Sequence, residues 1–151
     1  MLSEICLYLK NWFDYKQPKY LGSFTISDNT ISYGGNISMD IKEEQYYRIV
    51  GSVFNDGVYK KGSEELVDET FQGAVWAMAV PPAVESLTAD IEAWVAKYGG
   101  VNSENMSPFQ SESFGGYSYT KASGGSSSAS GSSVPTWQGV FADRLRRYKK
   151  L

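Results

Sequence analysis

The sequence contains a run, residues 123–133, that consists only of serine, glycine and alanine. Such a run has no side chains to bury and behaves as a flexible linker whose length sets reach rather than shape. The residues after it, 134–151, are again apolar, aromatic and basic. The chain is therefore predicted to consist of a folded body (1–122), a linker (123–133) and a C-terminal segment (134–151). This organisation favours a role in assembly over a role in catalysis.

Charge is distributed unevenly between the body and the C-terminal segment. The 151-residue chain carries a net charge of −3, yet its last eight residues include five Lys and Arg and no acidic residue, so the remaining 143 carry −8. Proteins that bind nucleic acid in general gain affinity by neutralising phosphates with clustered Lys and Arg. The acidic body argues against that class of function.

The residue types available for chemistry are few. The chain has no histidine and a single cysteine, Cys6, in the apolar pattern of the first predicted helix. This composition excludes an internal disulfide, a histidine-bearing catalytic triad and a Cys/His zinc site. The carboxylates of 64–69 could bind a cation or act as acid and base, but their spacing favours a solvated acidic turn. We expect no enzyme activity, cofactor or metal.

Two further features bear on ligands and location. Gly115 and Gly116 are followed by Tyr-Ser-Tyr rather than by the Lys-Ser/Thr of a phosphate-binding loop. The chain has no apolar run of 18 residues, and its first residues lack the pattern of a secretory signal. We therefore expect synthesis in the cytosol and no membrane partner.

The apolar periodicity of the body changes from helical to alternating and back. Residues 3–14 have helical spacing, with Ser3 available as an N-cap. Alternation then predicts a hairpin around the turn 27–29 and a further strand, or a continuation, at 37–41. A second hairpin follows, with strands at 45–50 and 58–59 and turn residues at 55–57, and we assign 71–80 as a strand rather than a helix. Together 22–80 are predicted to curl into a small barrel-like sheet.

The second half of the body is predicted to contain one helix and one aromatic arm. Pro81 and Pro82 precede a clear amphipathic helix at 83–98, which Gly99 and Gly100 end. Residues 107–122 are polar with isolated aromatic residues and are predicted to form an extended loop or a hairpin arm. The four aromatic side chains of this arm are Phe109, Phe114, Tyr117 and Tyr119.

Residues 134–151 are predicted to form an amphipathic basic helix that begins at Thr136. Its apolar face consists of Trp137, Val140, Phe141, Leu145 and Tyr148. Such a helix suits a membrane surface, a nucleic acid or a groove on another protein, and it could also fold back onto its own body. Its short length and its linker to an acidic body favour docking on a protein, with the apolar face in a groove and the arginines paired with carboxylates.

Four segments resemble the head–tail connector proteins of tailed bacteriophages and prophages of Gram-positive hosts: GSVFNDGVY (51–59), DETFQGAVW (68–76), SESFGGYSY (111–119) and WQGVFADRL (137–145). The resemblance implies a neck component, or adaptor, with a small helical core and a C-terminal segment that reaches the portal. The β-rich stretch between the two body helices departs from that pattern. The fold class expected is therefore α+β: a small helical core, a β-rich barrel-like insertion (22–80) and a tethered C-terminal helix.

The resemblance also implies partners and a location. The expected assembly is a homo-oligomeric ring, a dodecamer in the family, in the neck of the virion between the portal and downstream neck or tail proteins, with genomic DNA passing through without sequence-specific binding. The residues expected to dock on the portal are Trp137, Val140, Phe141, Arg144, Leu145, Arg146, Arg147 and Tyr148. The residues expected to contact ring neighbours are Phe109, Phe114, Tyr117 and Tyr119. Another neck or tail-completion protein, or a host small-barrel binding module, are the alternatives.

Overall fold

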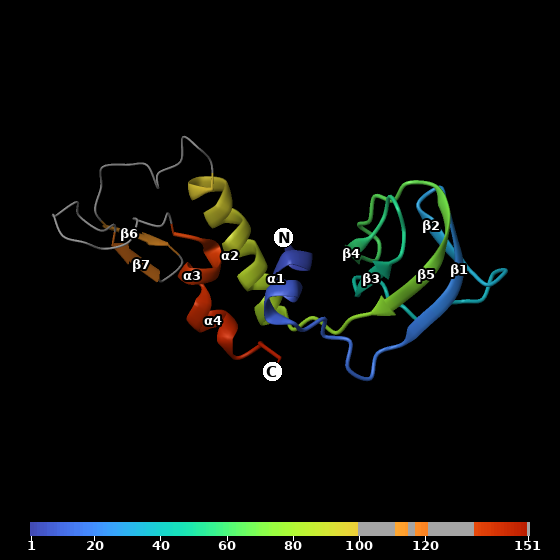
Figure 1. Cartoon of the computed structure of the whole chain (residues 1–151), viewed down its shortest axis with the longest axis horizontal. Coiled ribbons are helices and arrows are strands. Elements are labelled where there is room, and N and C mark those ends of the chain that lie inside the picture. Colours follow the sequence, from blue (N-terminus) through green and yellow to red (C-terminus); the bar gives the residue numbers. More distant parts are fainter. Residues whose placement is uncertain (100–110, 115–116, 121–134, 151) are drawn as a thin grey trace. The chain divides into compact units, whose positions relative to one another are not determined.

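The computed structural model of the chain describes residues 1–99, 111–114, 117–120 and 135–150. The chain divides into two compact units, which we call the sheet unit (2–81) and the helical unit (82–151, with Met1) (Figure 1). The fold class is α+β, as predicted, with a curled sheet and several helices. Among the described residues, none of the helices combines the length and apolar character that crossing a bilayer requires.

The sheet unit contains a five-stranded antiparallel sheet in the order β2-β1-β5-β3-β4. Its strands are β1 (Lys19–Ser27), β2 (Thr30–Tyr33), β3 (Tyr46–Val50), β4 (Gly57–Lys60) and β5 (Glu69–Ala77). The sheet curls into a half-barrel (Figure 1), so the predicted barrel-like sheet is confirmed. Both predicted hairpins, β1–β2 and β3–β4, are present, and the segment assigned as a strand at 71–80 is β5.

Local turn chemistry accounts for the first hairpin and for the missing strand after it. Asp28 and Asn29, both with positive φ (47° and 63°), form the two-residue connection that suits the twist of antiparallel strands. The strand predicted at 37–41 does not form. Three successive left-handed residues, 34–36, turn the chain back, so that only an isolated bridge between Tyr33 and Ile37 remains.

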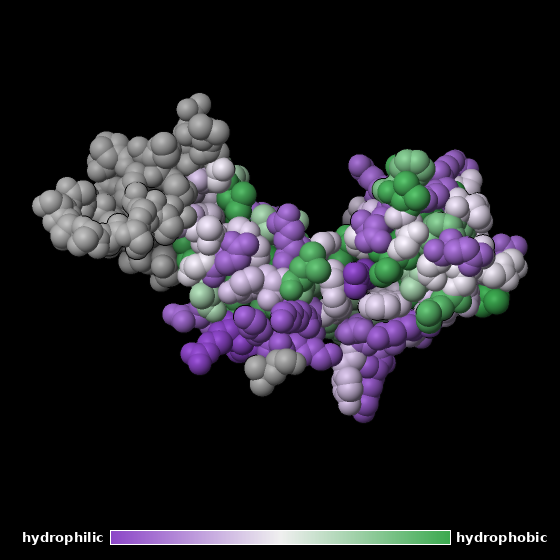
Figure 2. All heavy atoms as spheres, in the orientation of Figure 1, coloured by the Kyte–Doolittle hydropathy of each residue, from purple (hydrophilic) through white to green (hydrophobic). Residues whose placement is uncertain are grey.

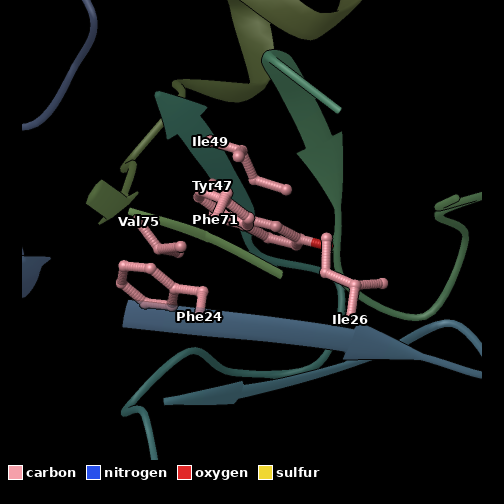
Figure 3. Close-up of a cluster of buried hydrophobic side chains, with 6 residues drawn as sticks. All are labelled: Phe24, Ile26, Tyr47, Ile49, Phe71 and Val75. Atoms are coloured by element: carbon pink, nitrogen blue, oxygen red, sulfur yellow. The ribbon is translucent and has the colours of Figure 1, made fainter. Parts of the chain in front are cut away.

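The concave face of the sheet holds an apolar core. Alternate residues of β1, β3 and β5 point into it (Figure 3): Phe24, Ile26, Tyr47, Ile49, Phe71 and Val75. The Phe24 and Phe71 rings stack with centroids 5.3 Å apart. The hydroxyl of Tyr47 donates a hydrogen bond to Glu64 at 3.2 Å, and burial raises the pKa of this tyrosine. Each of these side chains contributes about 1.5–3 kcal/mol through burial.

The first helix, α1 (Leu2–Leu9), is shorter than the 3–14 predicted. It ends because Lys10 adopts φ 52°, while Asn11 N–H donates to the Cys6 carbonyl and Lys10 N–H to the Leu7 carbonyl. These two bonds form a Schellman motif, which satisfies the last carbonyls of the helix. The motif places Trp12 outside the helix. The Ser3 hydroxyl does not cap α1; it accepts a hydrogen bond from Val58 N–H at 3.2 Å.

The helical unit is built on α2 (Pro82–Tyr98), close to the predicted 83–98. The C-terminal segment forms two short helices, α3 (Trp137–Val140) and α4 (Ala142–Arg146), instead of the single helix predicted, because Phe141 leaves helical geometry at φ −101° and ψ 9°. Thr136 caps α3 as predicted, accepting from Gly139 N–H at 3.4 Å. Strands β6 (Ser111–Phe114) and β7 (Tyr117–Thr120) pair antiparallel. The linker 123–133 lies outside the described residues.

Candidate interaction surfaces

The C-terminal segment packs within the helical unit through its apolar residues. Val140, Phe141 and Leu145 are 5%, 1% and 1% exposed, and α3 contacts α2. The ring of Phe141 meets that of Trp94 edge to face, with centroids 6.5 Å apart. In this structure these three side chains are therefore not available to fill a groove on another protein. Of the alternatives left open for this segment, the structure shows the one in which it folds back onto its own chain, and docking by these residues stays a prediction.

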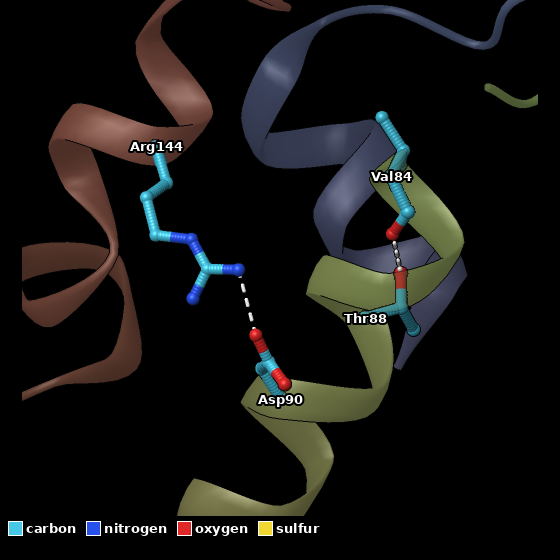
Figure 4. Close-up of polar contacts among 4 residues, drawn as sticks. All are labelled: Val84, Thr88, Asp90 and Arg144. Carbon is cyan, nitrogen blue, oxygen red and sulfur yellow. Dashed lines mark hydrogen bonds and ion pairs between the residues drawn. The ribbon is translucent and has the colours of Figure 1, made fainter. Parts of the chain in front are cut away.

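Arg144, also expected to dock on the portal, forms an ion pair within the helical unit. Its Nη2 lies 2.6 Å from Oδ2 of Asp90 on α2 (Figure 4). Both side chains are more than a third exposed, so the pair contributes only about 0.2–1 kcal/mol. The pair links α4 to α2.

The outward face of the C-terminal segment is strongly basic. Arg146, Arg147, Lys149 and Lys150 are exposed, whereas Trp137 and Tyr148 are half-buried. Hydrophilic side chains accordingly gather over α4 in Figure 2. We call these four exposed residues the basic face.

The aromatic arm is described only in its backbone. Phe114 pairs with Tyr117, and Tyr119 pairs with Glu112, in the register of β6 and β7. This pairing agrees with the hairpin alternative for 107–122. Phe109 lies outside the described residues.

The β3–β4 loop, residues 51–56, is held mainly by the carboxylate of Glu69 at the start of β5, and within the loop Asp56 accepts a hydrogen bond from Gly51 N–H at 2.9 Å. Glu69 accepts hydrogen bonds from the Ser52 hydroxyl, from Val53 N–H at 2.9 Å and Phe54 N–H at 3.4 Å, and from the Asn55 amide at 3.0 Å. The Ser52 hydroxyl bond is the largest cause that lowers the pKa of Glu69, and the other three bonds act in the same direction. These bonds join the loop backbone to the first residue of β5.

Two asparagine side chains fix the neighbouring segment, 64–69. Asn55, 1% exposed, donates to the Val67 carbonyl at 2.9 Å and accepts from Val67 N–H at 2.8 Å. Asn29, in the β1–β2 turn, accepts from Leu66 N–H at 2.7 Å and donates to the Glu64 carbonyl. The segment expected to be a solvated acidic turn is thus joined to two other loops. Sequence patterning did not reveal this network, because its partners lie 12 to 37 residues apart.

Replacing Glu69 by glutamine is expected to lower the unfolding midpoint at neutral pH. The charged carboxylate is the acceptor of these bonds, and its folded pKa is below its ordinary value of 4.5. Its stabilising effect is therefore complete above pH 4.5 and is lost as pH falls through the folded pKa. Thermal unfolding of wild type and Glu69→Gln between neutral and acid pH should show a difference that shrinks below pH 4.5.

The exposed Glu65 provides the matched control for this change, since it is a carboxylate of the same segment. Glu65→Gln should leave the unfolding midpoint near that of wild type at every pH. A Glu69→Gln midpoint equal to wild type at neutral pH would contradict the assigned role of the carboxylate.

A second feature that sequence patterning missed is a stack of aromatic rings and cations on the convex face of the sheet. Lys19, Trp76 and Arg48 lie opposite one another on β1, β5 and β3. The Arg48 guanidinium lies 3.6 Å from the ring centre of Trp12 and 5.3 Å from that of Trp76. Lys19 Nζ lies 4.7 Å from the Trp76 ring and pairs with Asp14 at 2.5 Å. We call Trp12, Arg48 and Trp76 the Arg48 stack.

Arg48 has no charged partner within the part of the chain that the structure describes: no carboxylate lies within ion-pair distance of its guanidinium. Stacking covers the faces of a guanidinium and leaves the N–H donors at its edge for other groups. The Arg48 stack therefore offers hydrogen-bond donors and positive charge that the described residues do not use.

Burial raises the pKa of the Cys6 thiol to about 12, and this side chain is 0% exposed. A nucleophilic cysteine needs a lowered pKa and access to substrate. In the described ranges, no three Asp, Glu, His or Cys side chains converge to hold a metal ion. The candidate interaction surfaces are the basic face, the β3–β4 loop and the Arg48 stack.

Comparisons of the chain with protein-family models, with curated proteins and with solved structures found no match.

Proposed function

We propose that the chain is a structural head–tail connector of a tailed bacteriophage, which forms a ring beneath the portal and joins the DNA-filled head to the tail. The observation that carries the proposal is the C-terminal segment. Its apolar residues hold it on α2, and its exposed basic face extends from an otherwise acidic chain. The resemblance of four segments to connector proteins supports the same function.

Because the apolar residues of the C-terminal segment are buried, docking on the portal depends in this proposal on its exposed charged residues. A pre-folded segment with exposed Arg and Lys binds a partner through charge, so the surface that it meets is acidic. The half-buried Trp137 and Tyr148 add aromatic area at the margin of the basic face. Binding then needs no unfolding of the segment, whose own core residues stay in place.

Charge reversal in the basic face tests the proposal. Arg146→Glu with Arg147→Glu, in the full-length chain, should weaken binding to the portal by about tenfold or more, because each charge faces an opposite charge there. The measurement is the dissociation constant for the portal protein at several salt concentrations. The effect should decline as salt screens the charges.

The matched control reverses two exposed lysines elsewhere, Lys42→Glu with Lys97→Glu, and gives the same net charge. This control should bind the portal as wild type does. Equal affinity of wild type and the Arg146/Arg147 variant would exclude the basic face as the docking surface.

A small-barrel module that binds nucleic acid is the second candidate, and the Arg48 stack is the observation that favours it. Aromatic rings beside an arginine are the residues on which single-stranded bases stack. That function requires DNA or RNA binding by the purified chain at physiological ionic strength, with a steep dependence on salt. The connector proposal expects no such binding, since residues 1–143 carry −8.

A further inference from the structure

The β3–β4 loop presents apolar side chains to solvent from a fixed backbone. Val53 and Phe54, at its tip, are 81% and 67% exposed, and the adjacent Val67 is 55% exposed. Glu69 and Asn55 hold the backbone of both segments. A rigid loop loses little conformational entropy when it binds, and clustered exposed apolar residues are typical of protein contacts. The loop therefore has the properties of an interaction surface.

The end of the sheet that carries this loop is acidic. The three loops that meet there contain Asp28, Asp56, Asp68 and Glu69. No Lys or Arg occurs in residues 20–41, 49–59 or 62–81. A partner for Phe54 must therefore combine an apolar surface with positive charge.

The opposite end of the same strands has that combination. The Arg48 stack lies there, and residues 10–19 add Lys10, Lys16 and Lys19 against the single Asp14. The side chain of Tyr15 is 80% exposed beside them. The Arg48 guanidinium has no carboxylate partner among the described residues. This basic, aromatic end is complementary to the acidic, apolar end.

The two ends of one sheet cannot meet each other. In β1 the acidic end is marked by Ile26, which pairs with Glu69, and the basic end by Lys19, which pairs with Trp76. Seven residues of extended strand separate these positions by about 23 Å. Two different surfaces at opposite ends of a rigid unit match each other only between copies, and this is a heterologous contact.

We propose that copies of this chain associate head to tail through the sheet unit, with the Val53–Phe54 tip of one copy against the Arg48 stack of the next. The inference rests on the proposed ring, which needs a heterologous contact that repeats until it closes. Phe54 packs beside Trp12, and the carboxylates around the loop pair with Arg48. Association should weaken as salt rises but persist in part, because the contact also buries apolar area.

Two variants of the full-length chain each remove one half of this contact. Phe54→Asp changes the tip, and Arg48→Glu changes the stack. Each variant alone should associate about 30-fold more weakly than wild type, the effect typical of losing a central aromatic or arginine residue. The measurement is sedimentation velocity over a range of protein concentrations. Circular dichroism and thermal unfolding establish that each variant is folded, and Tyr15→Asp, at a largely exposed residue, replaces Arg48→Glu if that variant is not.

Mixing the two variants gives the sharpest result. A Phe54→Asp copy keeps its stack and an Arg48→Glu copy keeps its loop tip, so equal amounts should form dimers that cannot grow further. The control is Leu7→Asp, the same kind of change at a residue that is 61% exposed on α1, and it should associate as wild type does.

Three outcomes would overturn the inference: a mixture that stays monomeric, variants that associate as strongly as wild type, and a wild-type chain that does not associate. In each of these cases the connector function stands if the wild-type chain still binds the portal. A wild-type chain that associates through this contact but does not bind the portal would leave the inference in place and contradict the proposed function.

Discussion

Replacing Phe141 by alanine is expected to destabilise the helical unit by about 3–5 kcal/mol, the usual cost of removing a large aromatic side chain from a core. Phe141 is 1% exposed and meets Trp94 of α2 edge to face. Because a chain with two compact units need not unfold in a single two-state step, amide hydrogen exchange is the measurement to use. Protection of α2 should fall, and protection of β1 and β5 should not change.

Arg146→Ala serves as the control for this change. Arg146 is an exposed residue of α4, so its removal should alter stability by no more than about 0.5 kcal/mol. Exchange in α2 that is the same in Phe141→Ala as in wild type would show that the C-terminal segment does not pack on α2.

Replacing Gly73 by alanine is expected to destabilise the sheet unit by about 3 kcal/mol or more, because the added methyl overpacks a site without space. A Cβ at Gly73 would lie 2.1 Å from the Val50 carbonyl oxygen, where β3 and β5 approach each other. The obstructing atom belongs to the backbone of a paired strand and cannot move aside as a flexible side chain does. Chemical denaturation, followed by exchange of the β1 and β5 amides, measures the effect.

Gly139 provides the opposite case for comparison. A Cβ there would come no closer than 3.7 Å to the Thr136 hydroxyl, an ordinary contact. Gly139→Ala, within α3, should therefore stabilise the chain by about 0.5–1 kcal/mol. If Gly73→Ala is also neutral or stabilising, the close approach of β3 and β5 at this residue is wrong.

Local patterns in the sequence predicted most of the secondary structure. Alternating apolar residues and the Asp28–Asn29 turn were sufficient for the hairpins, and the apolar stripe after Pro82 was sufficient for α2. The end of α1 was not predictable in this way, because a lysine, Lys10, occupies the left-handed position where glycine is usual. The strand predicted at 37–41 does not form, because three successive left-handed residues precede it and turn the chain back.

The candidate surfaces depend on contacts that periodicity does not contain. The apolar stripe of 134–151 fits a partner's groove and α2 equally well, and only tertiary structure shows that Phe141 is covered by its own chain. In the sequence, Glu69 is one of several carboxylates expected to face solvent. In the structure, the pairing of β3 with β5 places Ser52 and Val53 within hydrogen-bond distance of Glu69. The Arg48 stack depends on the same register.

Packing of the C-terminal segment also affects how its function is tested. Deleting 134–151 would remove Val140, Phe141 and Leu145 from the core and destabilise the helical unit, so a loss of assembly would have two explanations. Reversal of Arg146 and Arg147 leaves these core residues in place and changes two exposed side chains, of which Arg147 lies 5.0 Å from the centre of the Tyr148 ring. The two kinds of variant together separate folding of the segment from its binding.

The most direct test of the proposed connector function is a cryo-electron microscopy map of the neck of the tailed-phage particle to which the proposal assigns this chain. The account predicts density for a ring of copies between portal and tail, with the basic face of α4 turned toward an acidic surface of the portal. Purified particles that lack the chain, or a map that places it only within the tail, would contradict it.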